Sequence, residues 1–165
     1  LEKEKHQRRH DIIPPQVKIA GNYTSSMMAK WQARKNGYDE IIFTDEEGYI
    51  TEASTSNVFI VNRDNVLLTA PEKDVLFGIT RKSILEIAEF ENIVTKVKRI
   101  PATELENAKE IFLTSSSHLV CPIIKIDNRP INNGISGIIT NRLRDRFLRI
   151  SKNEDNSYSS WLEVI

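Results

Sequence analysis

Apolar residues recur at helical spacing in three stretches of the chain, and a fourth stretch is typical of a single helical turn. These segments are residues 24–35, 80–90, 138–150 and, for the short turn, 104–108. In the first segment Met27, Met28 and Trp31 follow the helical period, and the pair Asn36-Gly37 is a common helix end. The pattern therefore predicts three helices and one helical turn.

Short apolar runs between turn-forming residues predict strands. These runs are residues 41–43, 49–50, 58–61, 66–68, 93–100, 111–114 and 119–126. Residues 45–48 and 62–65 contain Asp, Asn or Gly, so each is expected to close a β-hairpin. Because strands outnumber helices, the sequence predicts an α+β or mixed α/β fold with helices packed on a mixed sheet.

A polar segment precedes this pattern. Residues 1–13 show no periodicity, and Pro14-Pro15 favours an extended entry rather than a helix. At 165 residues the chain is long enough for one compact domain and short for two. We therefore expect a separate N-terminal segment at residues 1–13 and one domain at residues 14–165.

Composition excludes several classes of function. Lys+Arg and Asp+Glu each number 23, so no net charge favours nucleic acid or a membrane surface. No apolar run approaches the ~20 residues of a membrane helix, and no signal-peptide pattern is present. The single cysteine, Cys121, fits a reducing compartment, and no metal-binding spacing occurs. We expect a cytoplasmic protein without a metal, a nucleic-acid partner or a membrane partner.

Lys18 is the first candidate for chemistry. Val17 and Ile19 flank it, and burial among apolar residues disfavours the ammonium form, which lowers the pKa of a lysine. A neutral amine can attack a carbonyl carbon. Tyr23 follows closely, either to hydrogen-bond a cofactor oxygen or to pack. An ordinary surface lysine is the alternative interpretation.

Glu52 is the second candidate. It ends a predicted strand bordered by apolar residues, where a carboxylate is costly unless it is paired. It is either a half-exposed hairpin glutamate or an ionised carboxylate that keeps a pyridine nitrogen protonated, so that the ring withdraws electrons. Residues 54–57, Ser-Thr-Ser-Asn, supply short hydrogen-bonding side chains, or form a simple turn.

Two stretches have the residues of an anion-binding turn. Residues 78–81, Gly-Ile-Thr-Arg, open a predicted helix, where free N–H groups and the Thr80 hydroxyl suit a phosphate; a plain Thr80 N-cap is the alternative. Residues 114–117 place four hydroxyl side chains after a strand, or form a polar loop. His118 follows them, but no G-x-S-x-G pattern supports a serine hydrolase.

In this order and spacing the motifs resemble the class IV aminotransferases, the fold-type IV enzymes that use pyridoxal 5′-phosphate (PLP). The resemblance runs from about Pro14 to Arg149. It implies that Lys18 is the catalytic Schiff-base lysine and that Glu52, 34 residues further on, faces the pyridine nitrogen. The matching cofactor-binding positions are Tyr23, Ile79, Thr80 and Ser116, and the matching substrate-binding positions are Ser116 and Ser117.

Within the family, different motifs are similar to different groups of enzymes. Residues 21–23 and 160–162, with Pro14 ahead of the lysine, are similar to branched-chain amino acid aminotransferases, whereas residues 52–57 are closer to D-amino acid aminotransferases. Aminodeoxychorismate lyases usually lack the tyrosine. The resemblance favours transamination of a branched-chain L-amino acid with 2-oxoglutarate. The alternatives are a D-amino acid aminotransferase and, in a different class, a non-catalytic truncated domain.

Family members also have an N-terminal domain that contributes a phosphate-binding arginine and much of the substrate pocket, and they are generally homodimers. No residue before Lys18 matches that domain. The resemblance therefore implies that this chain is the C-terminal domain of the D-amino acid aminotransferase-like fold. We expect the N-terminal domain to lie upstream and residues 1–13 to be a remnant of the interdomain linker.

Overall fold

The computed structural model describes residues 2–7 and 14–161. Its strands are β1 (Glu2–Gln7), β2 (Ile41–Thr44), β3 (Ile50–Ala53), β4 (Asn57–Val61), β5 (Leu67–Thr69), β6 (Thr95–Val97), β7 (Glu110–Ser115), β8 (Leu119–Ile123), β9 (Lys125–Ile126) and β10 (Arg129–Pro130). Its helices are α1 (Ala20–Lys35), α2 (Ile79–Phe90), α3 (Glu104–Asn107) and α4 (Ile138–Ser151), with 3-10 turns η1 (Glu72–Asp74), η2 (Asn132–Gly134) and η3 (Asn156–Trp161). The predicted mixed sheet with packed helices is confirmed.

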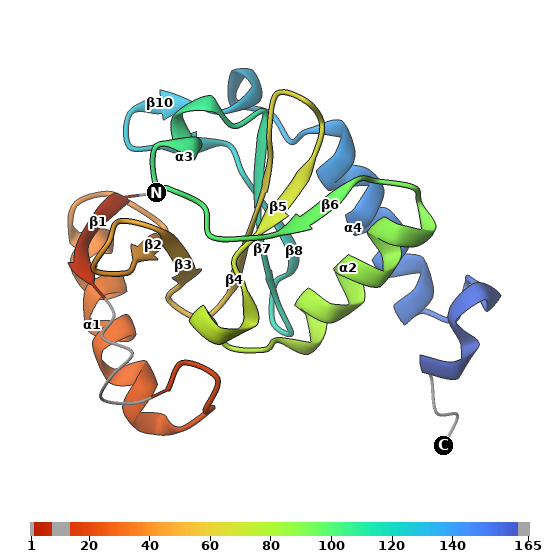
Figure 1. Cartoon of the computed structure of the whole chain (residues 1–165), viewed down its shortest axis with the longest axis horizontal. Coiled ribbons are helices and arrows are strands. Elements are labelled where there is room, and N and C mark those ends of the chain that lie inside the picture. The colour runs from red at the N-terminus through yellow and green to blue at the C-terminus, as the bar shows by residue number, and fades with distance from the viewer. Residues whose placement is uncertain (1, 8–13, 162–165) are drawn as a thin grey trace.

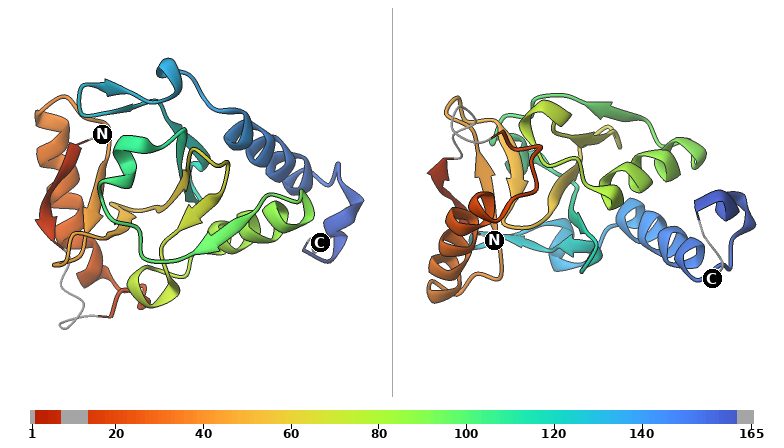
Figure 2. Two further views of the ribbon diagram at one scale, coloured as in Figure 1. Left: turned by 45° about the horizontal axis from the view of Figure 1, so that its top comes forward. Right: turned by 90° about the horizontal axis from the view of Figure 1, so that it is seen from below.

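Eight strands form one sheet in the order β1-β2-β3-β4-β5-β6, with β7 pairing with β4 and with β8. Both predicted hairpins are confirmed, since β2 pairs antiparallel with β3 and β4 with β5. Only Glu52 and Asn57 pair between β3 and β4. Helix α1 lies at one end of the molecule, and α2 and α4 lie side by side at the other (Figures 1 and 2).

Strand β4 is buried on both faces, which explains its uninterrupted apolar sequence. Val58 and Ile60 face the core shared with β3 and β7, whereas Phe59 and Val61 face the core beneath α2 and α4. The Phe59 ring stacks on the ring of Phe112, its partner on β7, with centroids 5.0 Å apart. The centre of the sheet is therefore fixed from both sides.

Helix α1 packs differently from the sequence prediction. It begins at Ala20, four residues early, and buries the small residues Ala29 and Ala33 against β2. The predicted apolar positions Met27, Met28 and Trp31 are exposed instead. Small side chains let the helix approach the strand closely, so the face with the alanines turns inward and the face with the large residues turns outward.

Two predicted strands are shorter than expected, and two strands, β1 and β10, were missed. After β6 the chain leaves β5 and crosses to β3, where the Ile100 carbonyl accepts the Ile50 N–H at 2.8 Å, so the predicted strand 93–100 is interrupted. The predicted strand 119–126 divides into β8 and β9. Strand β1 pairs parallel with β2 despite its polar sequence, because backbone hydrogen bonds at a sheet edge need no apolar residues. Residues 8–13 lie outside the described residues, and the linker assignment stays a prediction.

Helix α4 begins on a buried carboxylate. Glu110, the first residue of β7, accepts the N–H groups of Ile139 at 3.1 Å and Thr140 at 2.7 Å, and also the Thr140 hydroxyl at 2.7 Å. A Cβ atom at Gly137 would lie 1.9 Å from the carboxyl carbon of Glu110, so only glycine permits this approach. Glu110 thus supplies the N-cap that the helix's own residues do not.

Replacing Glu110 by alanine should lower the free energy of unfolding by about 2 kcal/mol, because two N–H groups of α4 and a buried hydroxyl lose their acceptor. Urea denaturation measures this loss. The exposed residue Glu89 on α2 provides the control, since Glu89→Ala should change stability by no more than about 0.5 kcal/mol. Equal effects of the two variants would contradict the capping role.

Candidate active site

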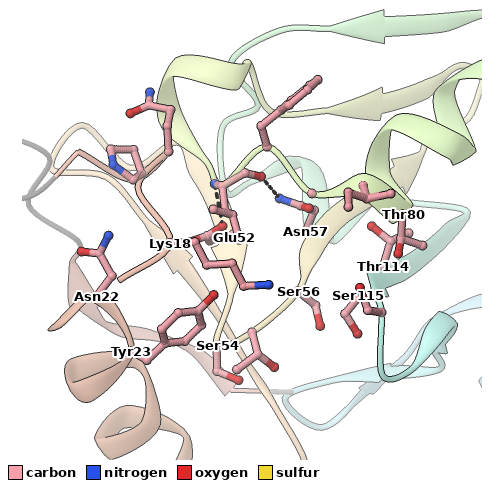
Figure 3. Close-up of a pocket in the computed structure, with 18 of the residues that line it drawn as sticks. Lys18, Asn22, Tyr23, Glu52, Ser54, Ser56, Asn57, Thr80, Thr114 and Ser115 are labelled. Carbon is pink, nitrogen blue, oxygen red and sulfur yellow. Dashed lines mark hydrogen bonds between the residues drawn. The ribbon is translucent and has the colours of Figure 1, made fainter. Parts of the chain in front are cut away.

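A cleft of about 300 Å³ lies where five segments meet (Figure 3). They are the segment before α1 with the first turn of that helix, the β3–β4 connection, the loop before α2, the first residues of α2, and the end of β7 with the turn that follows. The lining residues are Pro15, Gln16, Val17, Lys18, Asn22, Tyr23, Glu52, Ser54, Thr55, Ser56, Asn57, Leu76, Phe77, Gly78, Ile79, Thr80, Thr114, Ser115 and Ser116. Six of the seven predicted site residues are thus brought together, and Ser117 is the exception.

Lys18 enters the cleft from the segment before α1, beside Tyr23 (Figure 3). Its predicted burial is wrong, since Lys18, Val17 and Ile19 are all exposed. Apolar neighbours in sequence do not bury a residue on an irregular segment that follows the rim of an open cleft. The Asn22 side chain holds this segment by donating to the Val17 carbonyl at 2.7 Å and to the Pro14 carbonyl at 3.3 Å.

Glu52 is buried, with 6% of its surface exposed, so the interpretation as a half-exposed hairpin glutamate is wrong. Its Oε2 atom accepts the Leu76 N–H at 3.0 Å. The neighbouring strand residue Asn57 donates through Nδ2 to the Leu76 carbonyl at 2.8 Å. Both polar groups of one loop residue are therefore held by the β3–β4 connection, which places a carboxylate at the base of the cleft.

Helix α2 presents its N-terminus to the cleft. The N-cap residue is Gly78, which has no side chain to accept from the first N–H groups of the helix. The alternative of a Thr80 N-cap is therefore wrong: Thr80 is the second helical residue and is buried, whereas Ile79 is exposed. Uncapped N–H groups and the positive end of the helix dipole suit an anion such as a phosphate.

The three serines at the end of β7 and in the following turn differ in their relation to the cleft. Ser115 and Ser116 line the cleft, whereas Ser117 does not. The Ser117 hydroxyl lies 3.0 Å from Nδ1 of His118 and 3.2 Å from the Ser115 hydroxyl. The role assigned to Ser117 by resemblance stays a prediction, and in this structure its hydroxyl is engaged within the turn.

Two buried hydroxyl groups in the cleft wall lack partners within residues 2–7 and 14–161. They are Ser54 Oγ and Thr114 Oγ1. A buried polar atom without a partner is costly, so these groups point to a polar ligand in the cleft. Both hydroxyl-rich stretches are visible in the sequence, but no sequence signal distinguishes Ser54, Thr114 or Asn57 within them.

Arg81 holds the loop before α2 at the end that follows β5. It is fully buried and donates through Nη2 to the Ala70 carbonyl at 2.9 Å. Burial lowers the pKa of the Arg81 guanidinium, and Glu72, whose carboxylate is 4.0 Å away, opposes this shift. The loop is therefore fixed where it leaves β5 as well as at Leu76.

The described parts of the chain show no group of three or more His, Cys, Asp or Glu side chains placed to hold a metal ion. Across residues 2–7 and 14–161, no helix has the length and apolar character needed to span a membrane.

Comparison with known proteins identifies the family. The sequence model of amino-transferase class IV matches residues 2–126, well over half of the chain. The chain belongs to this family. Class IV aminotransferases bind PLP. Among curated class IV relatives, a probable branched-chain amino acid aminotransferase of Aquifex aeolicus is 37% identical over 161 residues, covering 96% of this chain and 52% of the relative. The branched-chain amino acid aminotransferase of Escherichia coli K12 is 32% identical over 156 residues, covering 94% and 50%.

Solved structures agree with this class IV assignment. The branched-chain aminotransferase of the thermophilic archaeon Thermoproteus uzoniensis, solved with norvaline, superposes with a TM-score of 0.92 at 35% identity, covering 98% of this chain and 54% of that one. The Thermobaculum terrenum branched-chain amino acid aminotransferase in its PLP form gives 0.93 at 30% identity, covering 98% and 53%. The predicted fold-type IV architecture is confirmed. The chain spans about half the length of the relatives it matches.

Two replacements of Glu52 test how much its hydrogen bond to Leu76 stabilises the protein. Glu52→Ala leaves the Leu76 N–H without its acceptor and should cost about 1–2 kcal/mol of unfolding free energy. Glu52→Gln keeps an acceptor oxygen, so it should cost less than half as much. Urea denaturation of the cofactor-free protein measures both, and equal losses would show that the bond to Leu76 contributes little.

Proposed function

We propose that the protein containing this chain transfers the amino group of a branched-chain L-amino acid to 2-oxoglutarate with PLP as cofactor, and that this chain supplies the cofactor-binding part. The observation that carries the proposal is the cleft, in which a reachable lysine, a buried carboxylate and an uncapped helix N-terminus meet. These three groups come from separate elements, so their meeting is a property of the fold and not of one local motif.

The cleft has a group suited to each part of PLP. The N-terminus of α2, with the hydroxyls of Thr80 and Ser116, suits the phosphate. Glu52 suits the ring nitrogen as a hydrogen-bond acceptor, and the amine of Lys18 suits the aldehyde. The unpaired Ser54 and Thr114 hydroxyls would find partners on a polar ligand. When bound, PLP supplies an aldehyde that reacts with amines and a ring that withdraws electrons.

The residues of this chain then have distinct tasks. Nζ of Lys18 would accept the proton lost from the substrate α-carbon and deliver it to C4′, the carbon of the PLP aldehyde group, which an amine on the cleft rim can do as general base and acid. Buried Glu52 holds the ring nitrogen in its protonated form through a charge-assisted hydrogen bond. Tyr23, whose ring lies beside Lys18 in Figure 3, orients the cofactor through its hydroxyl.

The names of the relatives support branched-chain substrates. The similarity of residues 52–57 to D-amino acid aminotransferases keeps that activity as the second candidate. A homodimer, a cytoplasmic location and an N-terminal domain upstream stay predictions from the family resemblance.

Lys18→Ala should abolish the visible absorbance band that PLP shows when it is bound covalently to a lysine. It should also lower kcat by about 10²–10⁴-fold, the range of a lost general acid–base group. Lys35→Ala is the matched control, because Lys35 also belongs to the α1 region but packs over the Trp31 ring outside the cleft. A band that survives in Lys18→Ala would refute the role of Lys18.

Substrate choice and activity are tested together. The full-length protein and this chain alone are each offered L-leucine or D-alanine with 2-oxoglutarate, and glutamate formation is measured. We expect the full-length protein to prefer L-leucine. Preference for D-alanine would establish the D-amino acid activity instead. Turnover of L-leucine by this chain alone at an ordinary enzyme rate would rule out the non-catalytic truncated domain, and absence of turnover by this chain alone would favour it.

A further inference from the structure

The loop from Ala70 to Gly78 is held by several of the elements that build the cleft. Gln16, two residues before Lys18, donates through Nε2 to the Lys73 carbonyl at 2.5 Å. Glu52 accepts the N–H of Leu76, and Asn57 donates to the carbonyl of Leu76. Because this loop leads directly into α2, its conformation sets where the N–H groups of that helix point.

Asn57 makes a second contact with the same loop. A Cβ atom at Gly78 would lie 2.4 Å from Asn57 Oδ1, well inside van der Waals contact. Gly78 has φ −71° and ψ 136°, a conformation that any residue adopts, so the glycine is needed for the close approach and not for its backbone angles. The amide of Asn57 therefore holds Leu76 on one side and rests against the N-cap of α2 on the other.

The position of Asn57 is itself rigid. Its strand neighbours are Glu52 on β3 and Thr114 on β7, and its side chain is buried. Both neighbours line the cleft, and Asn57 lies between them in the sheet. A buried strand residue that is bonded to a loop can transmit the geometry of the sheet to the start of the helix.

We propose that Asn57 is a positioning residue that sets the α2 N-terminus as a phosphate site. This inference rests on the proposed function, because it assigns the anion at that helix end to the phosphate of PLP. Asn57 acts through the Leu76–Gly78 loop. Its removal therefore weakens the binding of ligands that carry the phosphate and leaves the binding of ligands that lack the phosphate nearly unchanged.

A double-mutant cycle in the full-length protein tests the proposal. Asn57→Ala, Gly78→Ala and the double variant are compared by the dissociation constants of PLP and of pyridoxal, which lacks the phosphate. Each single variant should raise the dissociation constant of PLP by about tenfold, the effect of one lost hydrogen bond or one displaced turn. The dissociation constant of pyridoxal should change by less than about twofold. The double variant should bind PLP as Asn57→Ala does, because removing the amide makes room for the new methyl group.

Asn62→Ala is the matched control. The Asn62 side chain accepts the N–H groups of Asp64 and Val66 in the β4–β5 turn and lies outside the cleft. It should reduce the melting temperature without changing the affinity for PLP. This comparison separates loss of stability from loss of positioning.

Three results would overturn the inference while leaving the proposed function intact. They are an unchanged affinity for PLP in Asn57→Ala, an equal loss of affinity for PLP and for pyridoxal, and additive losses of PLP affinity in the double variant. If Gly78→Ala fails to fold, the ratio of PLP to pyridoxal affinity in Asn57→Ala decides alone. If the unmutated full-length protein binds no PLP, the proposed function fails and this inference fails with it.

Discussion

The cleft depends on one contact between strands, the pairing of Glu52 on β3 with Asn57 on β4. Through it, two side chains from neighbouring strands reach the same loop residue, Leu76, one taking its N–H and the other its carbonyl. The peptide groups on both sides of Leu76 are therefore each held by one bond, and neither can rotate without breaking it. The position of the carboxylate and the direction of α2 are therefore set by the same few atoms.

The rest of the fold serves to keep this contact in place. Strand β4 carries Asn57 at its start and then buries Phe59 and Ile60 on opposite faces. The stacked rings of Phe59 and Phe112 fix β4 against β7, which carries Thr114 into the cleft wall. Because packing on both sides of a central strand resists displacement, the polar residues at its end hold their geometry.

The sequence predicted what local periodicity and short motifs determine. The hairpins, α2 and α4 follow from apolar spacing and turn residues, and six of the seven site residues found by resemblance meet in one cleft. Contacts between residues far apart in the sequence could not be predicted from local patterns. The burial of Ala29 in place of Met28, the exposure of Lys18 and the bond from Asn57 to a residue 19 positions away all depend on tertiary contacts. The polar strand β1 was missed because backbone pairing leaves no hydrophobic signal.

The charge of the cleft explains why positioning matters here. Among the described lining residues, Lys18 alone carries a cationic side chain and Glu52 alone an anionic one. The proposed phosphate site in this chain thus consists of backbone N–H groups and hydroxyls. Neutral donors must point at the anion, because a hydrogen bond weakens steeply when it is bent. The attraction of a charged side chain depends only on its distance from the anion. A site built from dipoles therefore requires a fixed helix end, and the contacts at Leu76 and Gly78 supply one.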